Sequence, residues 1–155
     1  MSAAVEGYKA SYLDKFAFLV VINGFARAGF SNVTGLNEEA EVIEYREGGH
    51  LRPHKSPGTL NSNEITLERG ETDDADLFDW WEKVYNYAQE SGGVEDADYK
   101  LDFQIVQLDR GKNIRKTWNV YGSWPSSFNV DDFDASANEK HMERIVLQND
   151  GFERA

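Results

Sequence analysis

The sequence predicts a mainly β protein: an antiparallel β-sandwich or small barrel of about seven strands, with one α-helix laid over it. Several segments alternate apolar and polar residues, as half-buried strands do. A single segment after Gly70 has apolar residues at helical spacing instead. The 155 residues include nine Phe, seven Tyr and four Trp, which is enough bulky material for one core. We therefore expect residues 1–155 to form one domain.

The first third of the chain predicts three strands. Lys15–Ile22 is apolar on both faces, which is typical of a central strand covered on both sides. Asn23-Gly24 predicts a hairpin turn, followed by a return strand over Phe25–Val33 with a possible bulge at Gly29. Glu38–Tyr45 also reads as a strand, but its apolar residues fall on both faces, as expected if partner subunits cover it.

Residues 46–62 predict a long exposed loop. The segment has three glycines, two prolines and almost no large apolar side chain, so it cannot bury itself. It exceeds the ~12–15 residues beyond which a structureless loop usually has a function. It also carries Arg46, Arg52 and Lys55 in a chain of net charge −12, which indicates docking on an acidic surface. Asn63–Arg69 then alternates strictly and predicts a strand with Ile65 on its inner face.

The helix is predicted after Gly70, capped by Thr72 or Asp74 and ended by Ser91-Gly92-Gly93. Trp80 falls off the centre of the apolar stripe, where it could pack at the rim or contact a partner. The stripe itself comprises Leu77, Phe78, Trp81, Val84, Tyr85 and Ala88.

The last third predicts strands again. Tyr99–Ile105 alternates, and Asp109–Lys112 connects it to a return strand that includes Ile114, Trp118 and Val120, with Gly111 available for a left-handed position. Gly122–Phe128 should break that strand, with Pro125 restricting pairing to an edge. His141–Asn149 predicts a final strand with Ile145 and Leu147 inward, and Asp150–Ala155 a short polar tail.

Composition excludes several classes of protein. A net charge of −12 argues against a surface that binds DNA or anionic lipid. The absence of cysteine excludes disulfides and thiolate metal sites. Met1–Lys15 lacks the pattern of a signal peptide, and Phe16–Ile22 is too short to cross a bilayer. We therefore expect a protein made in the cytoplasm with no membrane anchor.

The sequence offers no convincing site for chemistry. His50 and His54 are four residues apart, a spacing that suits a metal on a helix, but Pro53 and the nearby glycines make a helix implausible. The carboxylates fall where alternating strands and a solvated helix face require them, and none forms a distinctive acid–base pair. We expect no catalytic residue, no cofactor and no metal.

An ordered set of short motifs resembles the tail-tube proteins of contractile-tailed phages and of extracellular contractile injection systems. The motifs span nearly the whole chain: Phe30–Leu36, Glu41–Gly49, Pro57-Gly58, Ile65–Gly70, Leu77–Trp81, Trp124-Pro125, Ala135–Glu139 and Gly151–Arg154. The resemblance implies a non-enzymatic protomer whose hexameric rings stack into a hollow conduit for DNA or protein. It also implies contacts with a contractile sheath protein, a baseplate or tube initiator and tape-measure proteins, in a particle made in bacteria.

The resemblance and the strand pattern also give candidate site residues. The family segment matching 46–62 reaches the adjacent ring, which implies inter-ring roles for Arg46, Glu47, His50, Arg52, His54 and Lys55. Strand alternation gives four candidate lumen-facing carboxylates: Glu41, Glu64, Glu68 and Asp102. The alternatives are a tube initiator or adaptor at the baseplate, or a monomeric β-sandwich that binds a ligand on Trp80 and Trp124.

Overall fold

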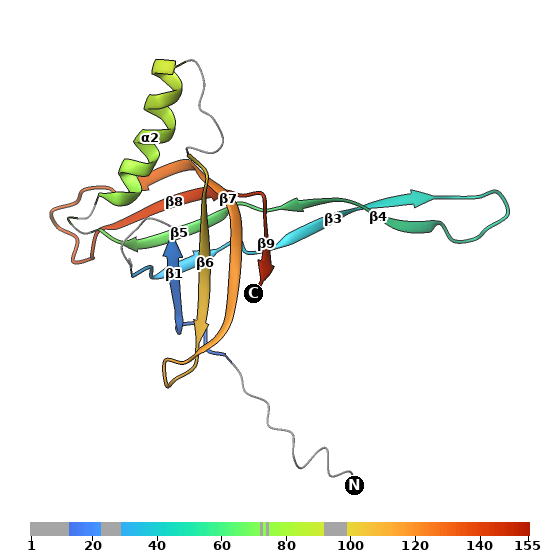
Figure 1. Ribbon diagram of the computed structural model, residues 1–155, viewed down its shortest axis with the longest axis horizontal. Coiled ribbons are helices and arrows are strands. Elements are labelled where there is room, and N and C mark those ends of the chain that lie inside the picture. Colours follow the sequence, from blue (N-terminus) through green and yellow to red (C-terminus); the bar gives the residue numbers. More distant parts are fainter. Residues whose placement is uncertain (1–12, 23–28, 72, 74, 92–98) are drawn as a thin grey trace, which may run out of the picture.

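The computed structural model describes residues 13–22, 29–71, 73, 75–91 and 99–155, which form a bent antiparallel sheet, a projecting hairpin and one helix (Figure 1). The elements are β1 Phe18–Ile22, β2 Asn32–Thr34, β3 Glu38–Tyr45, β4 His54–Ser62, β5 Ile65–Gly70, α2 Asp76–Ser91, β6 Leu101–Leu108, β7 Ile114–Val130, β8 Met142–Gln148 and β9 Gly151–Arg154. The sheet order is β1-β6-β7-β8-β5-β2, with β9 also paired to β7, while β3 and β4 form a separate pair. The mainly β prediction is confirmed.

Strand β7 links two layers. Its first part pairs with β6 and β9, and its second part pairs with β8. Gly122 has a φ of 60°, a value that favours glycine, and its N–H donates to Asp102 Oδ1 at 2.9 Å. The first layer thus contains β1, β6, β9 and the start of β7, and the second layer contains β2, β5, β8 and the end of β7.

The prediction that this strand breaks over Gly122–Phe128 is wrong, because β7 continues through the segment. Pro125 is buried within β7 and pairs with Leu147 of β8. The pairing register shifts between Pro125 and Ser127, and such an irregularity is a place where a strand tolerates proline.

The core lies between the two layers. Ile65 and Leu67 of β5 and Ile145 and Leu147 of β8 are completely buried, as their alternation predicts. Buried side chains of the first layer complete the core: Val20, Ile22, Phe103, Ile105 and Val120.

Strand β1 is an edge strand, which contradicts the prediction of a central strand. It pairs with β6 and has no second neighbour among the described residues. Leu19 on its outer face is 39% exposed, and Phe16, just before the strand, is 75% exposed, so this edge carries apolar side chains that the described residues leave uncovered. The predicted turn at Asn23-Gly24 lies outside the described residues. Strand β2 pairs with β5 rather than with β1.

Helix α2 buries a face that overlaps the predicted stripe but is rotated from it: Leu77 and Val84 belong to that stripe, and Trp80 does not. Leu77, Trp80 and Val84 are buried, and Trp80 Nε1 donates to the carbonyl oxygen of Tyr99 at 3.0 Å. Phe78, predicted to lie on the buried stripe, is 42% exposed. Adjacent apolar residues recur at 77/78, 80/81 and 84/85, so the spacing allows two stripes one residue apart, and the first residue of each pair is the buried one. The predicted caps Thr72 and Asp74 lie outside the described residues.

The C-terminal residues and one turn also differ from prediction. Instead of a polar tail, β9 pairs with β7, and Phe152 packs edge-on against Trp118 with ring centroids 5.9 Å apart. In the β6–β7 turn, Lys112 rather than Gly111 has the left-handed backbone, with φ 63°. Asp109 Oδ1 accepts the Asn113 N–H at 2.9 Å and closes this turn.

Candidate assembly surfaces

The most conspicuous surface is the hairpin of β3 and β4, which projects from the two-layered body (Figure 1). The sequence predicts a loop over residues 46–62, but residues 54–62 form strand β4 and the loop is confined to 46–53. Strand β4 has few of the β-branched and aromatic residues that mark a strand, so its pattern is weak. The segment forms a strand because it pairs with β3, in a register that places Val42 opposite Pro57 and Tyr45 opposite His54.

The hairpin exposes apolar side chains without a core of its own. Every residue of β3 is exposed. A two-stranded hairpin is at best marginally stable in water, and a contiguous exposed apolar surface marks an interaction site. The hairpin therefore has the character of a docking element. Its exposed large apolar residues are Val42, Ile43, Tyr45, Leu51 and Leu60.

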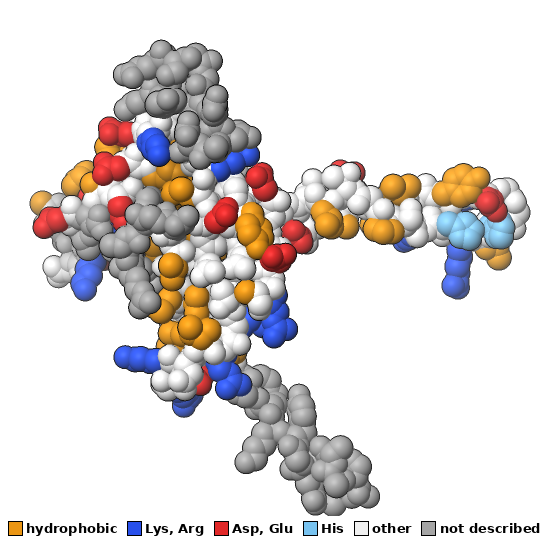
Figure 2. Space-filling view, in the orientation of Figure 1, with side chains coloured by type: hydrophobic (Ala, Val, Ile, Leu, Met, Phe, Trp, Pro, Cys, Tyr) orange, Lys and Arg blue, Asp and Glu red, His pale blue; other side chains and the backbone are white. Residues whose placement is uncertain are grey.

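The structure brings the six predicted inter-ring residues together at the far end of this hairpin. All six are exposed, and histidine, basic and acidic side chains lie near the tip, well away from the two-layered body (Figure 2). Lys55 Nζ lies 3.8 Å from Glu44 Oε1 of the opposite strand. Contact with a second ring stays a prediction for all of them. In chain order they are Arg46, Glu47, His50, Arg52, His54 and Lys55.

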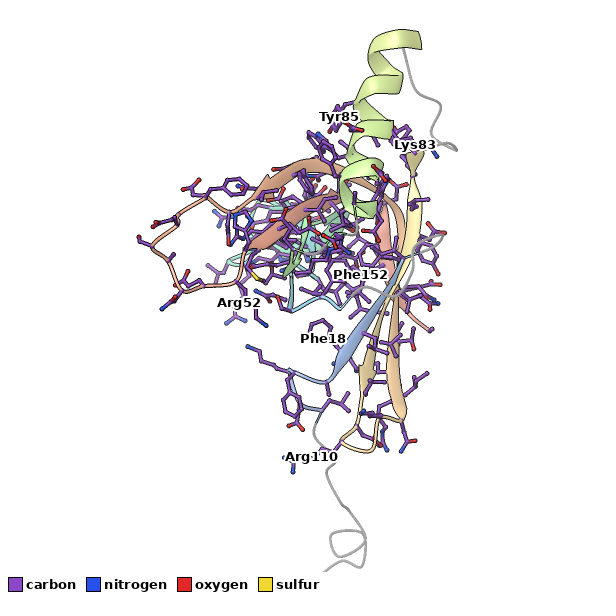
Figure 3. The ribbon with its side chains drawn as sticks, turned by 90° about the vertical axis from the view of Figure 1, so that its left-hand side faces the viewer. Phe18, Arg52, Lys83, Tyr85, Arg110 and Phe152 are labelled. Atoms are coloured by element: carbon purple, nitrogen blue, oxygen red, sulfur yellow. The ribbon has the colours of Figure 1, made fainter. Side chains whose placement is uncertain are left out.

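A second candidate surface is the open side of the sandwich, between the edge strands β1 and β2. A cavity of about 570 Å³ lies there, lined by both edges and by the side of the core. Phe18 projects from β1 on this side (Figure 3), and Val33 and Trp118 also line the cavity. Unpaired strand edges readily pair with another chain, so this side is suited to contact with a neighbouring protomer.

The structure does not gather the four predicted lumen carboxylates on one face. Asp102 lies on the outward side of the first layer, opposite in alternation to buried Phe103. Glu68 lies on the outward side of the second layer, with Oε2 3.4 Å from Arg144 Nε. Glu41 is on the hairpin, and Glu64 precedes β5 and accepts from Gln148 Nε2 at 3.2 Å. That any of them faces a lumen stays a prediction.

A histidine clamp holds the loop between β7 and β8. His141 Nδ1 lies within hydrogen-bond distance of the Glu71 carboxylate, and Nε2 is 2.6 Å from the carbonyl oxygen of Asp131. The hydrogen bond to Glu71 is the largest influence and raises the pKa of His141; partial desolvation lowers this pKa by less, and smaller contributions from Asp131 and from the Glu71 charge raise it further. Because these acceptors favour the imidazolium, the clamp is strongest when His141 is protonated.

We predict that an NMR titration gives His141 a pKa above the ordinary value of about 6.5. A raised pKa in the folded state means that the clamp's stabilising effect is complete below about pH 6.5 and is lost as the pH rises through the folded pKa. Glu71→Gln should move the pKa back toward the ordinary value. A wild-type pKa at or below about 6.5 would contradict the role of Glu71.

Among the described residues, the edge strands β1 and β2 of the two-layered β body each have one paired neighbour, and an apolar hairpin projects from this body. These features define a class of protein, the structural subunit of a larger assembly. The sequence profile of the family described as T4-like virus tail tube protein gp19 matches residues 14–153. The chain belongs to this family. It is a structural, non-enzymatic tail tube protein, a component of a phage tail or of a contractile injection particle.

Solved structures agree with this assignment. A chain of the PVC sheath–tube complex, an extracellular contractile injection system in its extended state, is 27% identical, with a TM-score of 0.80 over 100% of this chain and 98% of that one. A chain of the PVC sheath/tube terminator is 29% identical, with a TM-score of 0.79 over 94% and 98%. A chain of the anti-feeding prophage cap shares the fold, with 24% identity and a TM-score of 0.83 over 100% and 99%.

No curated protein sequence matches this chain. Within the described residues, no helix is both long and apolar enough to cross a membrane.

Proposed function

We propose that the chain is the protomer of an inner tube, forming hexameric rings that stack into a hollow conduit for DNA or protein cargo. The observation that carries the proposal is the family match over residues 14–153, combined with a hairpin that exposes its apolar residues away from the body. In an isolated protomer the apolar side chains of this hairpin stay exposed to water, whereas the next ring of a stack would cover them. On this proposal residues 1–155 act as a single tail-tube domain.

Ring closure would use the edge strands β1 and β2. Joining sheets between neighbouring protomers removes the unpaired edges, which are otherwise sites of uncontrolled aggregation. A closed symmetric ring also gives every protomer the same two contacts. The exposed Leu19 on β1 and the cavity on the open side are then covered by the next protomer.

Stacking would use the hairpin. Its apolar residues would supply the contact area, and Arg46, Arg52 and Lys55 would face acidic groups of the next ring and set the register. An acidic lumen would keep DNA or acidic cargo from adhering. Because Asp102 and Glu68 lie on opposite layers, a lumen wall built from one layer would present one of them and exclude the other.

The relatives support some of the proposed partners. The PVC relative at 27% identity comes from a sheath–tube complex, which supports a contractile sheath protein as a partner of this chain. A baseplate or tube initiator and a tape-measure protein would contact the tube at its end and in its lumen. A subunit at one end of the tube is the second candidate function, favoured by the 29% identity to a chain of the sheath/tube terminator structure.

The alternative of a monomeric binding module that uses Trp80 is not supported. Trp80 is 3% exposed and its indole N–H is already bonded within the fold, so it offers no stacking face to a ligand. Trp124 is half-buried and packs edge-on against Tyr99 with centroids 6.5 Å apart.

Light scattering on the purified chain over a concentration series tests ring formation. We expect the mass to rise from that of a 17.6 kDa protomer toward six protomers, about 106 kDa, and then to larger stacks. A species that stays at one or two protomers, even after a baseplate nucleus is added, would overturn the proposal.

A further inference from the structure

Two histidines and a glutamate converge in the turn of the hairpin. Glu47 and His50 lie in the 46–53 turn, and His54 is the first residue of β4. Each offers one ligand atom, and the three atoms all lie within 4.8 Å of one another. The expectation that His50 and His54 form no site assumed that only a helix could bring them together. The hairpin does so by a different geometry.

The backbone of the turn sets this arrangement. The His50 N–H donates to the carbonyl oxygen of Glu47 at 3.2 Å, and Gly49 has a φ of 89°, a left-handed value that suits glycine. This folds His50 back over Glu47, with Nε2 3.4 Å from Oε2. Cross-strand pairing with Tyr45 fixes His54 at the start of β4, and its ring meets that of His50 edge-on with centroids 5.5 Å apart.

We propose that Glu47, His50 and His54 form a binding site for a divalent transition-metal ion that prefers imidazole ligands, such as Zn²⁺. Two histidines and a glutamate are a known three-ligand set for zinc, and they leave a fourth position for water or for a donor from a second molecule. Metal–ligand bonds of about 2.0–2.1 Å separate neighbouring ligands of a tetrahedral site by roughly 3.3 Å. The separation between the His50 and Glu47 ligand atoms already has this length. Small rotations of the exposed His54 side chain would bring its separations from His50 and Glu47 to the same length.

The charges around the site affect how tightly it binds a cation, and its donor atoms determine which metals it prefers. Arg46 and Arg52 lie in the same turn and oppose a cation, but they are exposed and their effect is screened within about 8 Å at physiological salt. Imidazole donors favour Zn²⁺, Ni²⁺ and Cu²⁺ over Mg²⁺ and Ca²⁺, which prefer oxygen ligands alone. A bound ion would tie residue 47 to residue 54 and so restrict the turn between the two strands.

Isothermal titration of the full chain with Zn²⁺ in a non-chelating buffer tests the site. We expect one ion per chain, and the double variant His50→Gln/His54→Gln should bind at least about tenfold more weakly. Glu47→Gln should also weaken binding. The matched control Glu44→Gln, an exposed carboxylate on the same hairpin, should not. The remaining histidine, His141, is kept in every variant.

Hydrogen exchange gives a second readout that does not depend on affinity alone. Zn²⁺ should slow exchange across residues 46–53 in the wild type and leave the double variant unchanged. Equal Zn²⁺ binding by the wild type and the double variant, or no binding by the wild type at millimolar Zn²⁺, would overturn the proposal. All of the substituted side chains are exposed, so the variants should fold normally.

Discussion

Shortening the hairpin should abolish tube formation while leaving the protomer folded. Joining Val42 to Pro57 through an Asn-Gly turn removes residues 43–56 at a point where the two strands are directly paired. The deletion takes away exposed Ile43, Tyr45 and Leu51 but no buried residue of the core. A hot-spot residue at the centre of an interface contributes about 2 kcal/mol or more, which corresponds to roughly 30-fold in affinity, so losing even one such anchor should weaken each ring contact by about that factor.

The measurement is electron microscopy of wild type and variant at equal concentration, with circular dichroism and thermal unfolding as the folding control. A milder variant, Arg46→Glu/Arg52→Glu, keeps the apolar contact and reverses two charges at the tip. It should slow assembly and change its salt dependence rather than abolish tubes. Normal tubes from the shortened chain would refute the role of the hairpin.

Replacing Arg69 should destabilise the protomer more than any other single loss of charge described above. Arg69 is 3% exposed, donates to Asp76 at the start of α2 at 2.6 Å, and donates to the buried Glu143 of β8. The guanidinium thus joins the helix to the second layer. Arg69→Met leaves Glu143 buried without its cation, and removing one partner of a buried pair costs about 3–5 kcal/mol.

Urea denaturation at concentrations where the protein is monomeric measures this effect. Arg144→Met is the matched control, because Arg144 is more exposed and its pairs with Asp131 and Glu68 are screened by solvent, so its loss should matter far less. The double variant Arg69→Met/Glu143→Gln should recover part of the stability. An Arg69→Met protein within about 1 kcal/mol of wild type would show that the buried pair is not a structural link.

The sequence predicts the fold best where burial imposes a clear period. Strands β5, β6 and β8 alternate because each has one face on the core, and Ile65, Phe103 and Ile145 are buried as expected. It predicts poorly where burial is decided by a partner. Strand β1 is apolar on both sides yet lies at an edge, and β4 has too little apolar content to be distinguished from a loop.

Two other errors have local causes. Helix α2 has paired apolar residues at 77/78, 80/81 and 84/85, so the pattern fixes the helix but not which residue of each pair is buried. Strand β9 is only four residues long and polar at its end, too short for a period to appear.

For the candidate surfaces, the sequence gives the position and the chemistry but not the shape. The family resemblance places the inter-ring residues in 46–62, and they do lie together on a projection. The projection is a hairpin because strand pairing, a long-range property, turns most of the predicted loop into a ladder. The same pairing places His54 at the start of β4, and the turn brings His50 against it, an arrangement that spacing alone did not indicate.

Electron microscopy of the purified chain at high concentration tests the central claim most directly. We predict sixfold rings in end views and hollow, stacked tubes in side views. If the protein alone stays monomeric, a baseplate nucleus should start tube growth, because nucleation and mass action control assembly. Particles that remain single protomers at every concentration, with and without the nucleus, would contradict the account.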